Sequence, residues 1–110
     1  MPEVSNAEAR RLILHKDLLD FTGRPVYFQA PTSPTVKLQY PCTVYQLSDI
    51  YANSADDMNY KAVRRYQVTY ITKSPADRLI DEFVTHFRQI SFSRHFTSDG
   101  LNHYIYDLYF

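Results

Sequence analysis

The sequence is poor in several residue types, and each shortage excludes a class of protein. Cys42 is the only cysteine, so no disulfide forms within the chain and a disulfide-stapled secreted mini-domain is excluded. Two glycines are too few for a phosphate-cradling loop. No apolar run approaches the ~20 residues that cross a bilayer, and the first residues lack the order of a secretory signal. We therefore expect an aqueous intracellular location and no membrane partner.

Net charge is also lacking. Twelve Lys and Arg balance twelve Asp and Glu, which disfavours a globally basic nucleic-acid binder, because affinity for phosphate grows with the number of charges neutralised. The chain of 110 residues is 45% hydrophobic and 22% charged. These values are ordinary for a folded protein and predict a single domain spanning residues 1–110.

Tyrosine and phenylalanine are abundant instead, with ten Tyr and seven Phe but no Trp. A tyrosine ring is apolar and its hydroxyl is polar, so tyrosine suits surfaces that are dry in a complex and wet alone. The alternative is a β-rich core in which Tyr fills half-buried strand positions.

Two segments have helical patterns. Ser5 and Glu8 form a capping-box pattern, and we expect a helix over residues 6–20 that Gly23 terminates. Its expected apolar positions are Ala9, Leu12, Ile13 and Leu19. A second helix, over about residues 75–87, is predicted from the start signal Ser74-Pro75-Ala76-Asp77. Its apolar stripe comprises Leu79, Ile80, Phe83, Val84 and Phe87.

The rest of the chain predicts strands. A short strand is expected at residues 26–30 and a second at 36–44, where Pro41 indicates an edge or a break. Residues 48–60 have no clear period and predict a long loop. A strand follows at residues 62–72, with Tyr66, Val68 and Tyr70 on one face.

The last residues, 90–110, predict a hairpin with Asp99-Gly100 at its turn. Its second arm is apolar on both faces, so it is either central in a sheet or covered by a partner. The order α-β-β-β-α-β-β predicts an α+β fold, with two helices on a mixed, mainly antiparallel sheet.

Candidates for catalysis and metal binding are weak. Of the four His, we expect only His95 and His103 to face each other, across the hairpin, and two His alone rarely hold a metal. Cys42 lies in an apolar alternation without a neighbouring base, which is typical of a small buried side chain. Asp56-Asp57 is the only pair of adjacent aspartates and is most simply solvated. We therefore expect no enzymatic activity, no metal and no cofactor.

One segment mixes cations with aromatic residues as single-stranded nucleic-acid platforms do. It comprises Tyr60, Arg64, Arg65 and Tyr66. Because Arg64 and Arg65 point to opposite faces of a strand, an edge strand whose cations pair with carboxylates is the simpler interpretation.

Three stretches carry a resemblance to a known family: Tyr40 to Tyr45 (YPCTVY), Arg65 to Ile71 (RYQVTYI) leading into Ser74-Pro75, and Arg94 to His103 (RHFTSDGLNH). Together they resemble the tail terminator family, the tail-completion or head–tail joining proteins of long-tailed bacteriophages. The resemblance spans nearly the whole chain and is carried by scaffold motifs rather than by a catalytic signature.

The resemblance implies a ring, usually of six copies, that caps the tail tube, stops its polymerisation and joins the tail to the head connector. The implied partners are further copies of the chain, the major tail-tube protein and a head-completion protein of the neck. DNA would be present only as the passing genome, and the protein would reside in the virion tail or neck after assembly in the host cytoplasm. The nearest alternative is a head-closure (stopper) protein, and a less favoured one is a small nucleic-acid-binding module.

We expect the contacts between subunits, or with the tube, to involve the long loop, the strand after it and the aromatic end of the chain. The candidate residues are Tyr51, Asp56, Asp57, Met58, Tyr60, Arg64, Arg65, Tyr104, Tyr106, Tyr109 and Phe110. The acidic residues of the loop would suit a wall past which DNA slides.

Overall fold

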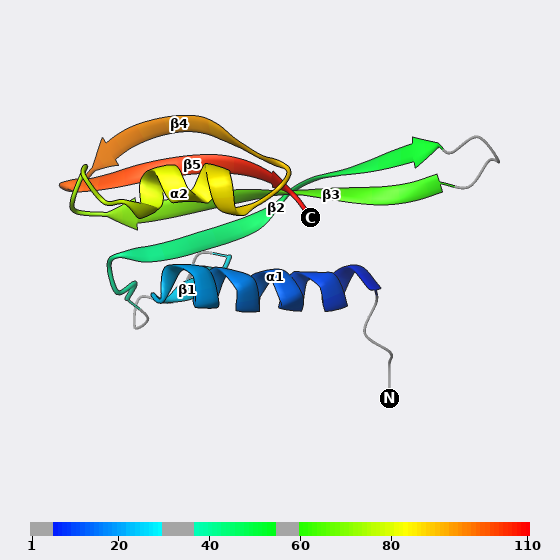
Figure 1. Cartoon of the computed structure of the whole chain (residues 1–110), viewed down its shortest axis with the longest axis horizontal. Helices are drawn as coiled ribbons and strands as arrows, with labels where there is room; N and C mark the ends of the chain where they lie inside the picture. The colour runs from blue at the N-terminus through cyan, green and yellow to red at the C-terminus, as the bar shows by residue number, and fades with distance from the viewer. Residues whose placement is uncertain (1–5, 30–36, 55–59) are drawn as a thin grey trace.

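The computed structural model describes residues 6–29, 37–54 and 60–110, and for residues 52–54 and 60–62 it describes the backbone alone. Within these residues there are two helices and five strands, which Figure 1 labels, and they confirm the predicted α+β class and element order. The elements are α1 (Asn6–Thr22), β1 (Val26–Phe28), β2 (Cys42–Ser54), β3 (Tyr60–Thr72), α2 (Leu79–His86), β4 (Ile90–Ser98) and β5 (Leu101–Tyr109).

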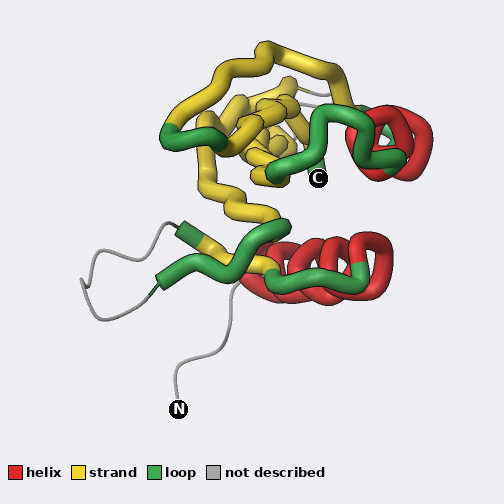
Figure 2. The backbone as a smooth tube through the Cα atoms, turned by 90° about the vertical axis from the view of Figure 1, so that its left-hand side faces the viewer, coloured by secondary structure: helices red, strands yellow, loops and turns green. Residues whose placement is uncertain are grey.

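The five strands form one sheet in the order β1-β2-β3-β5-β4. β1 runs parallel to β2, and every other neighbouring pair is antiparallel. Both helices lie on the same side of the strands, as Figure 2 shows. They pack on the face that carries Tyr45 of β2 and Tyr66, Val68 and Tyr70 of β3. The predicted apolar face of the third strand is therefore confirmed.

The aromatic side chains form the centre of this core. Tyr45, Tyr66, Tyr70 and Tyr106 are almost completely buried, as is Phe83 of α2. Burial of aromatic rings is the main source of folding free energy in a domain this small. Much of the tyrosine content thus belongs to the core, which was the alternative to an assembly surface.

The expected buried face of α1 is wrong, although the helix itself is confirmed. The helix buries Leu14, Leu18 and Thr22, whereas Leu12 and Ile13 are 52% and 61% exposed. Leucines occur on both sides of this helix, so hydrophobicity alone does not select the buried side.

Two polar side chains fix the orientation of α1. Arg11 Nη1 donates to the hydroxyl of Tyr45 at 3.1 Å, and His15 Nδ1 lies 2.8 Å from the same oxygen. That hydroxyl is enclosed in the core and requires a partner, so the side of the helix that supplies one faces the sheet. Glu8 accepts a hydrogen bond from Arg11, and Ser5, its expected partner in the capping box, lies outside the described residues.

α2 begins later than predicted, at Leu79 rather than near residue 75. Ser74 Oγ accepts a hydrogen bond from the amide of Ala76 and forms a local turn. Asp77 Oδ1 accepts the amide of Leu79 at 3.1 Å. Asp77 therefore satisfies the first turn of the helix, and Ser74 does not.

The predicted break between a strand at residues 36–44 and a loop at residues 48–60 is also wrong. β2 begins after Pro41 and continues to Ser54, where it pairs with Tyr60. Polar residues such as Ser48 and Asp49 occupy the ladder because this part of β2 is open to solvent. Only residues 55–59 of the predicted loop remain outside the described strands.

The terminal hairpin is confirmed, with Asp99 and Gly100 at positive φ (53° and 76°) in its turn. β5 lies between β3 and β4. Its residues Tyr104, Ile105, Tyr106 and Leu108 are buried by the chain itself. Of the two explanations for its apolar sequence, the central position is therefore correct.

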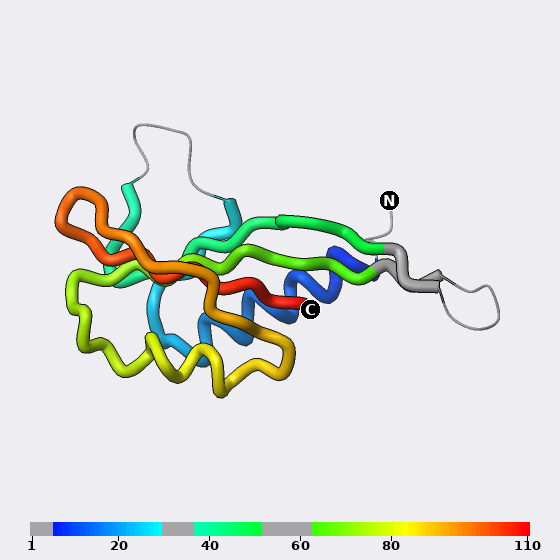
Figure 3. The backbone as a smooth tube through the Cα atoms, turned by 90° about the horizontal axis from the view of Figure 1, so that it is seen from above, coloured from blue at the N-terminus to red at the C-terminus, as the bar shows by residue number. Residues whose placement is uncertain are grey.

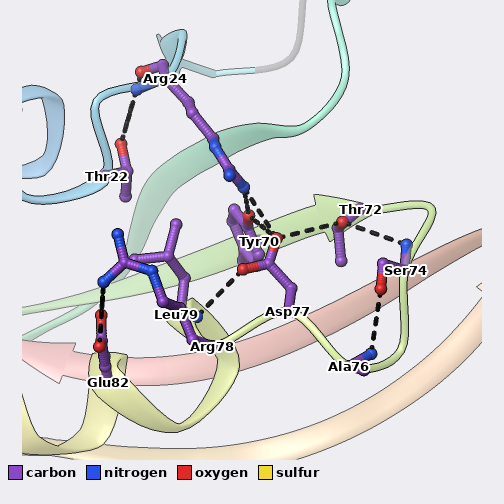
Figure 4. Close-up of polar contacts among 10 residues, drawn as sticks. All are labelled: Thr22, Arg24, Tyr70, Thr72, Ser74, Ala76, Asp77, Arg78, Leu79 and Glu82. Atoms are coloured by element: carbon purple, nitrogen blue, oxygen red, sulfur yellow. Dashed lines mark hydrogen bonds and ion pairs between the residues drawn. The ribbon is translucent and has the colours of Figure 1, made fainter.

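A polar cluster, drawn in Figure 4, joins the end of α1 to the start of α2. Asp77 Oδ2 accepts from Arg24 Nη1 at 2.7 Å and from the Tyr70 hydroxyl at 2.5 Å, and Arg24 also binds that hydroxyl. Burial tends to raise the pKa of Asp77, but hydrogen bonds from Tyr70, Leu79 and Arg24 outweigh burial and lower that pKa below its ordinary 3.8. The ionised carboxylate therefore stabilises the fold.

We expect Asp77→Asn to lower the free energy of unfolding by about 2 kcal/mol at pH 7, because it removes the charge from four hydrogen bonds. Because the pKa of Asp77 is lower in the folded state, its carboxylate stabilises the fold above about pH 4, and this stabilisation is lost as the pH falls further. The deficit of the variant should therefore shrink below about pH 4. Urea denaturation at pH 7, 5 and 3 measures it, with Asp99→Asn at the hairpin turn as control. A deficit independent of pH would contradict the charge argument.

Candidate assembly surface

A two-stranded arm projects from the body of the molecule. β3 pairs with β5 only from Arg65 onward, and β1 pairs only with residues 43–45 of β2. Beyond these points, residues 49–54 of β2 pair with residues 60–65 of β3 and with no other described strand. Figures 1 and 3 both show this arm running past the end of β5.

The arm makes the molecule elongated. Its extents are 50 × 34 × 23 Å and its radius of gyration is 15.4 Å, against about 13 Å for a compact chain of this length. A two-stranded ribbon alone is only marginally stable in water, because it has no third strand or helix to cover a face. The arm is therefore the part of the fold that most needs a partner.

Three predicted site residues meet at the base of the arm. The rings of Tyr51 and Tyr109 lie 6.2 Å apart, and the Arg65 guanidinium lies 5.7 Å from the centre of the Tyr51 ring. Arg65 also lies 3.9 Å from Asp49. The cluster thus presents aromatic faces and one cation on the sheet face away from the helices.

A groove adjoins this cluster, in the angle between the arm and the body. It has a volume of about 830 Å³ and is lined by Tyr51, Val63, Arg88, Gln89, Ile90, Ser91 and Tyr109. A second hollow of about 630 Å³ shares Val63, Arg88, Gln89 and Tyr109 with it and continues toward Arg10 and Phe110. Such a concave, partly apolar and cationic surface suits an extended segment of another chain.

The end of the chain closes the body beside the arm. The amide of Phe110 donates to the carbonyl of Arg64 at 3.2 Å, and the Arg10 guanidinium lies 5.0 Å from the centre of the Phe110 ring. Both predicted residues, Arg64 and Phe110, are therefore near the groove. Phe110 is half-buried, so part of its ring is already covered by its own chain.

Two predicted interface residues belong to the core instead. Tyr104 is 7% exposed and Tyr106 is 0% exposed. Tyr106 stacks on Phe83 with ring centres 4.9 Å apart and donates its hydroxyl to the carbonyl of Ile80 at 2.6 Å. Both side chains are buried within a single copy of the chain, and α2 covers Tyr106, so neither ring is open to another subunit in this structure. Asp56, Asp57 and Met58 lie outside the described residues, and for Tyr60 only the backbone position opposite Ser54 is described.

Two residues of the possible nucleic-acid platform, Tyr66 and Arg65, lie on opposite faces of the sheet. Tyr66 is 1% exposed and faces the helices, so its ring is closed to a base. Arg65 points to the opposite face, beside Tyr51. Base stacking needs aromatic rings and cations on one open face, and Tyr66 and Arg65 do not share one.

The sequence analysis missed several exposed apolar side chains. They are Leu47 and Ile50 on β2, Phe92 and Phe96 on β4, and Leu12, Ile13 and Leu19 on α1. The alternation of β4 contained the signal, because Phe92 and Phe96 occur in a strand rich in serine. Exposed apolar side chains gathered on strand edges are typical of surfaces that another chain covers.

The candidates for chemistry lie apart from this surface. Cys42 is buried, and burial raises the pKa of its thiol to about 11. His95 stacks on Tyr104 and His103 stacks on Phe96. The expectation that the two histidines face each other is therefore wrong, because their partners lie on opposite faces of the hairpin. Across the described ranges, no group of three His, Cys, Asp or Glu could hold a metal ion.

Comparison with known proteins gives no assignment: no protein-family model matches the chain, and no curated protein matches it. No helix within residues 6–29, 37–54 and 60–110 is both long and apolar enough to cross a membrane.

Proposed function

We propose that the protein is a non-enzymatic structural subunit of a bacteriophage virion. Copies assemble into a ring, of six subunits in the related family, that caps the tail tube, stops its growth and joins the tail to the head connector. The proposal combines the resemblance to tail terminators with the α-β-β-β-α-β-β order of elements.

The projecting arm is the observation that carries the proposal. Its described side chains include Ile50 and Tyr51, which are 50% and 39% exposed. A ribbon with exposed apolar side chains gains stability when a neighbour covers it. A ring gives every arm the same neighbour, which satisfies this requirement for all copies at once.

The proposed contact surface is the arm together with the groove at its base, which Tyr109 lines, and it leaves out the buried Tyr104 and Tyr106. The tail-tube protein and the neck protein are the proposed docking partners of the two ring faces. DNA passes through the ring as the genome and is not a ligand of the exposed sheet.

The test is assembly of the purified full-length chain. We expect light scattering over a concentration series to give the mass of a closed oligomer, and negative-stain images to contain rings of uniform diameter. Added to polymerising major tail-tube protein, the rings should stop tube growth at a fixed end. A protein that stays monomeric at all concentrations, with or without tube protein, would refute the proposal.

A further inference from the structure

We propose that neighbouring copies join edge to edge, with the outer edge of β4 in one copy pairing with the free edge of β2, residues 46–54, in the next. This inference rests on the proposed ring and specifies the contact that builds it. The partner surface is a second copy of this chain, and the linkage is a ladder of main-chain hydrogen bonds.

Both edges are open and have equal length. β4 ends the sheet order, and its residues 91–98 are all exposed. On the opposite side, β1 pairs only with residues 43–45, so no described strand covers residues 46–54 on that side. β4 has nine residues, and the segment from 46 to 54 also has nine. Each edge thus offers a row of unpaired amide and carbonyl groups.

The composition of these edges favours pairing. Proteins usually protect an exposed edge with Lys or Pro, and neither segment contains one. One bulge and one charge on each edge are the only protective features. Five of the ten exposed large apolar side chains of the described residues lie here. They are Leu47, Ile50 and Tyr51 on β2 and Phe92 and Phe96 on β4.

The charges on the two edges are complementary. Asp49 is the only charged residue in 46–54, and Arg94 is the only residue of β4 with a formal charge. Asp49 lies opposite Arg65 and Arg94 lies opposite Ile105. Ile105 in turn lies opposite Thr69 of β3. Arg65 and Thr69 are four residues apart on β3, so their side chains project from the same face of the sheet. Residues that lie opposite each other on neighbouring strands share a face, and Asp49 and Arg94 therefore project from that same face. Opposite charges attract across such a junction.

The strand directions also fit a ring. Within one copy, β2 is antiparallel to β3, β3 is antiparallel to β5, and β5 is antiparallel to β4. After three reversals, β4 runs antiparallel to β2. A rotation about an axis roughly along the strands leaves that relation unchanged between copies. The junction therefore continues the antiparallel pattern of the sheet, and because it uses two different edges it is head-to-tail, as a ring requires.

Pairing of β4 with a second β4 is the competing arrangement. It would bring two edges of the same charge together, each with Arg94, and like charges on paired strands destabilise the contact. It would also use one edge per copy and stop at a dimer. The charges therefore favour β2 as the occupant of the β4 edge.

Charge reversal tests the contact. We expect Arg94→Glu to raise the protein concentration at half assembly about tenfold, because it sets two carboxylates together. Asp49→Arg should do the same, and the double variant should return to within about threefold of the unchanged protein. Sedimentation velocity over a dilution series measures this, with Lys73→Glu, on an exposed residue away from both edges, as the control. Circular dichroism verifies that each variant is folded.

Cysteine cross-linking gives a second reading that does not depend on charge. A chain with Ile50→Cys mixed with a chain with His95→Cys should form a disulfide-linked heterodimer under mild oxidation. A chain with Lys73→Cys should not cross-link to either. Linkage of His95→Cys only to itself would overturn the proposal in favour of the β4–β4 dimer.

The outcomes separate the contact from the function. Rings that form normally with Arg94→Glu, and without the heterodimer, would refute the edge contact and leave the ring. Heterodimers without rings in the unchanged protein would support the edge contact and refute the ring.

Discussion

A chain lacking residues 106–110 is expected to lose its fold, not merely its capacity to assemble. The deletion removes Tyr106 and Leu108, which are 0% and 1% exposed, from the core. It also removes the pairing of this part of β5 with both β3 and β4. Burial of two such side chains contributes roughly 2–3 kcal/mol each, and a domain of this size has only about 5–15 kcal/mol in total.

Soluble yield and near-ultraviolet circular dichroism measure this outcome. The double variant Asp56→Asn, Asp57→Asn is the comparison, because it removes two charges and keeps every described core side chain, and it should remain folded. A truncated chain with native-like dichroism would contradict the central position of β5. A truncated chain that is folded but unable to form rings would indicate that Tyr106 contacts a neighbouring subunit.

The sequence predicted best those elements whose pattern is local. β3 alternates Tyr66, Val68 and Tyr70 with polar residues, and the buried face is the one expected. The hairpin of β4 and β5 follows from the Asp99-Gly100 turn, whose backbone has the positive φ values such a turn needs. Both helices were placed, although only approximately at their ends.

Prediction failed where distant residues decide the structure. The side of α1 that faces the sheet depends on the Tyr45 hydroxyl, thirty residues beyond His15, and no helical periodicity encodes that contact. The extent of β2 depends on β3, since the pairing of Ser54 with Tyr60 holds a polar segment in a ladder. Composition alone favours a loop there.

The candidate surface was predicted residue by residue but not as an arrangement. Tyr51, Arg65 and Tyr109 meet because the registers of β2 with β3 and of β3 with β5 align them. Tyr104 and Tyr106 resemble them in sequence, yet both are buried, and Tyr106 packs against Phe83 of α2. Whether a strand tyrosine is core or surface therefore depends on which face the helices occupy, and alternation alone does not reveal that face.

Truncation of Phe83 is expected to cause the second large loss of folding stability. Its ring is fully buried and contacts three other rings, those of Tyr106 at 4.9 Å, Phe21 at 5.1 Å and Tyr70 at 5.4 Å between ring centres. Phe83→Ala leaves a cavity where α1, α2 and the sheet meet. We expect a loss of about 3–5 kcal/mol in the free energy of unfolding, which places the variant near the limit of stability.

Urea denaturation of Phe83→Ala beside Val84→Ala measures this directly. Val84 is the next residue of the same helix but is 41% exposed, so its truncation should cost less than about 1 kcal/mol. The two substitutions by alanine raise helix propensity by similar amounts but differ in burial, so the difference between the variants reports the packing of α2 on Tyr106. Equal losses would mean that α2 does not cover β5 at Tyr106, and the Tyr106 ring would then be open to another subunit.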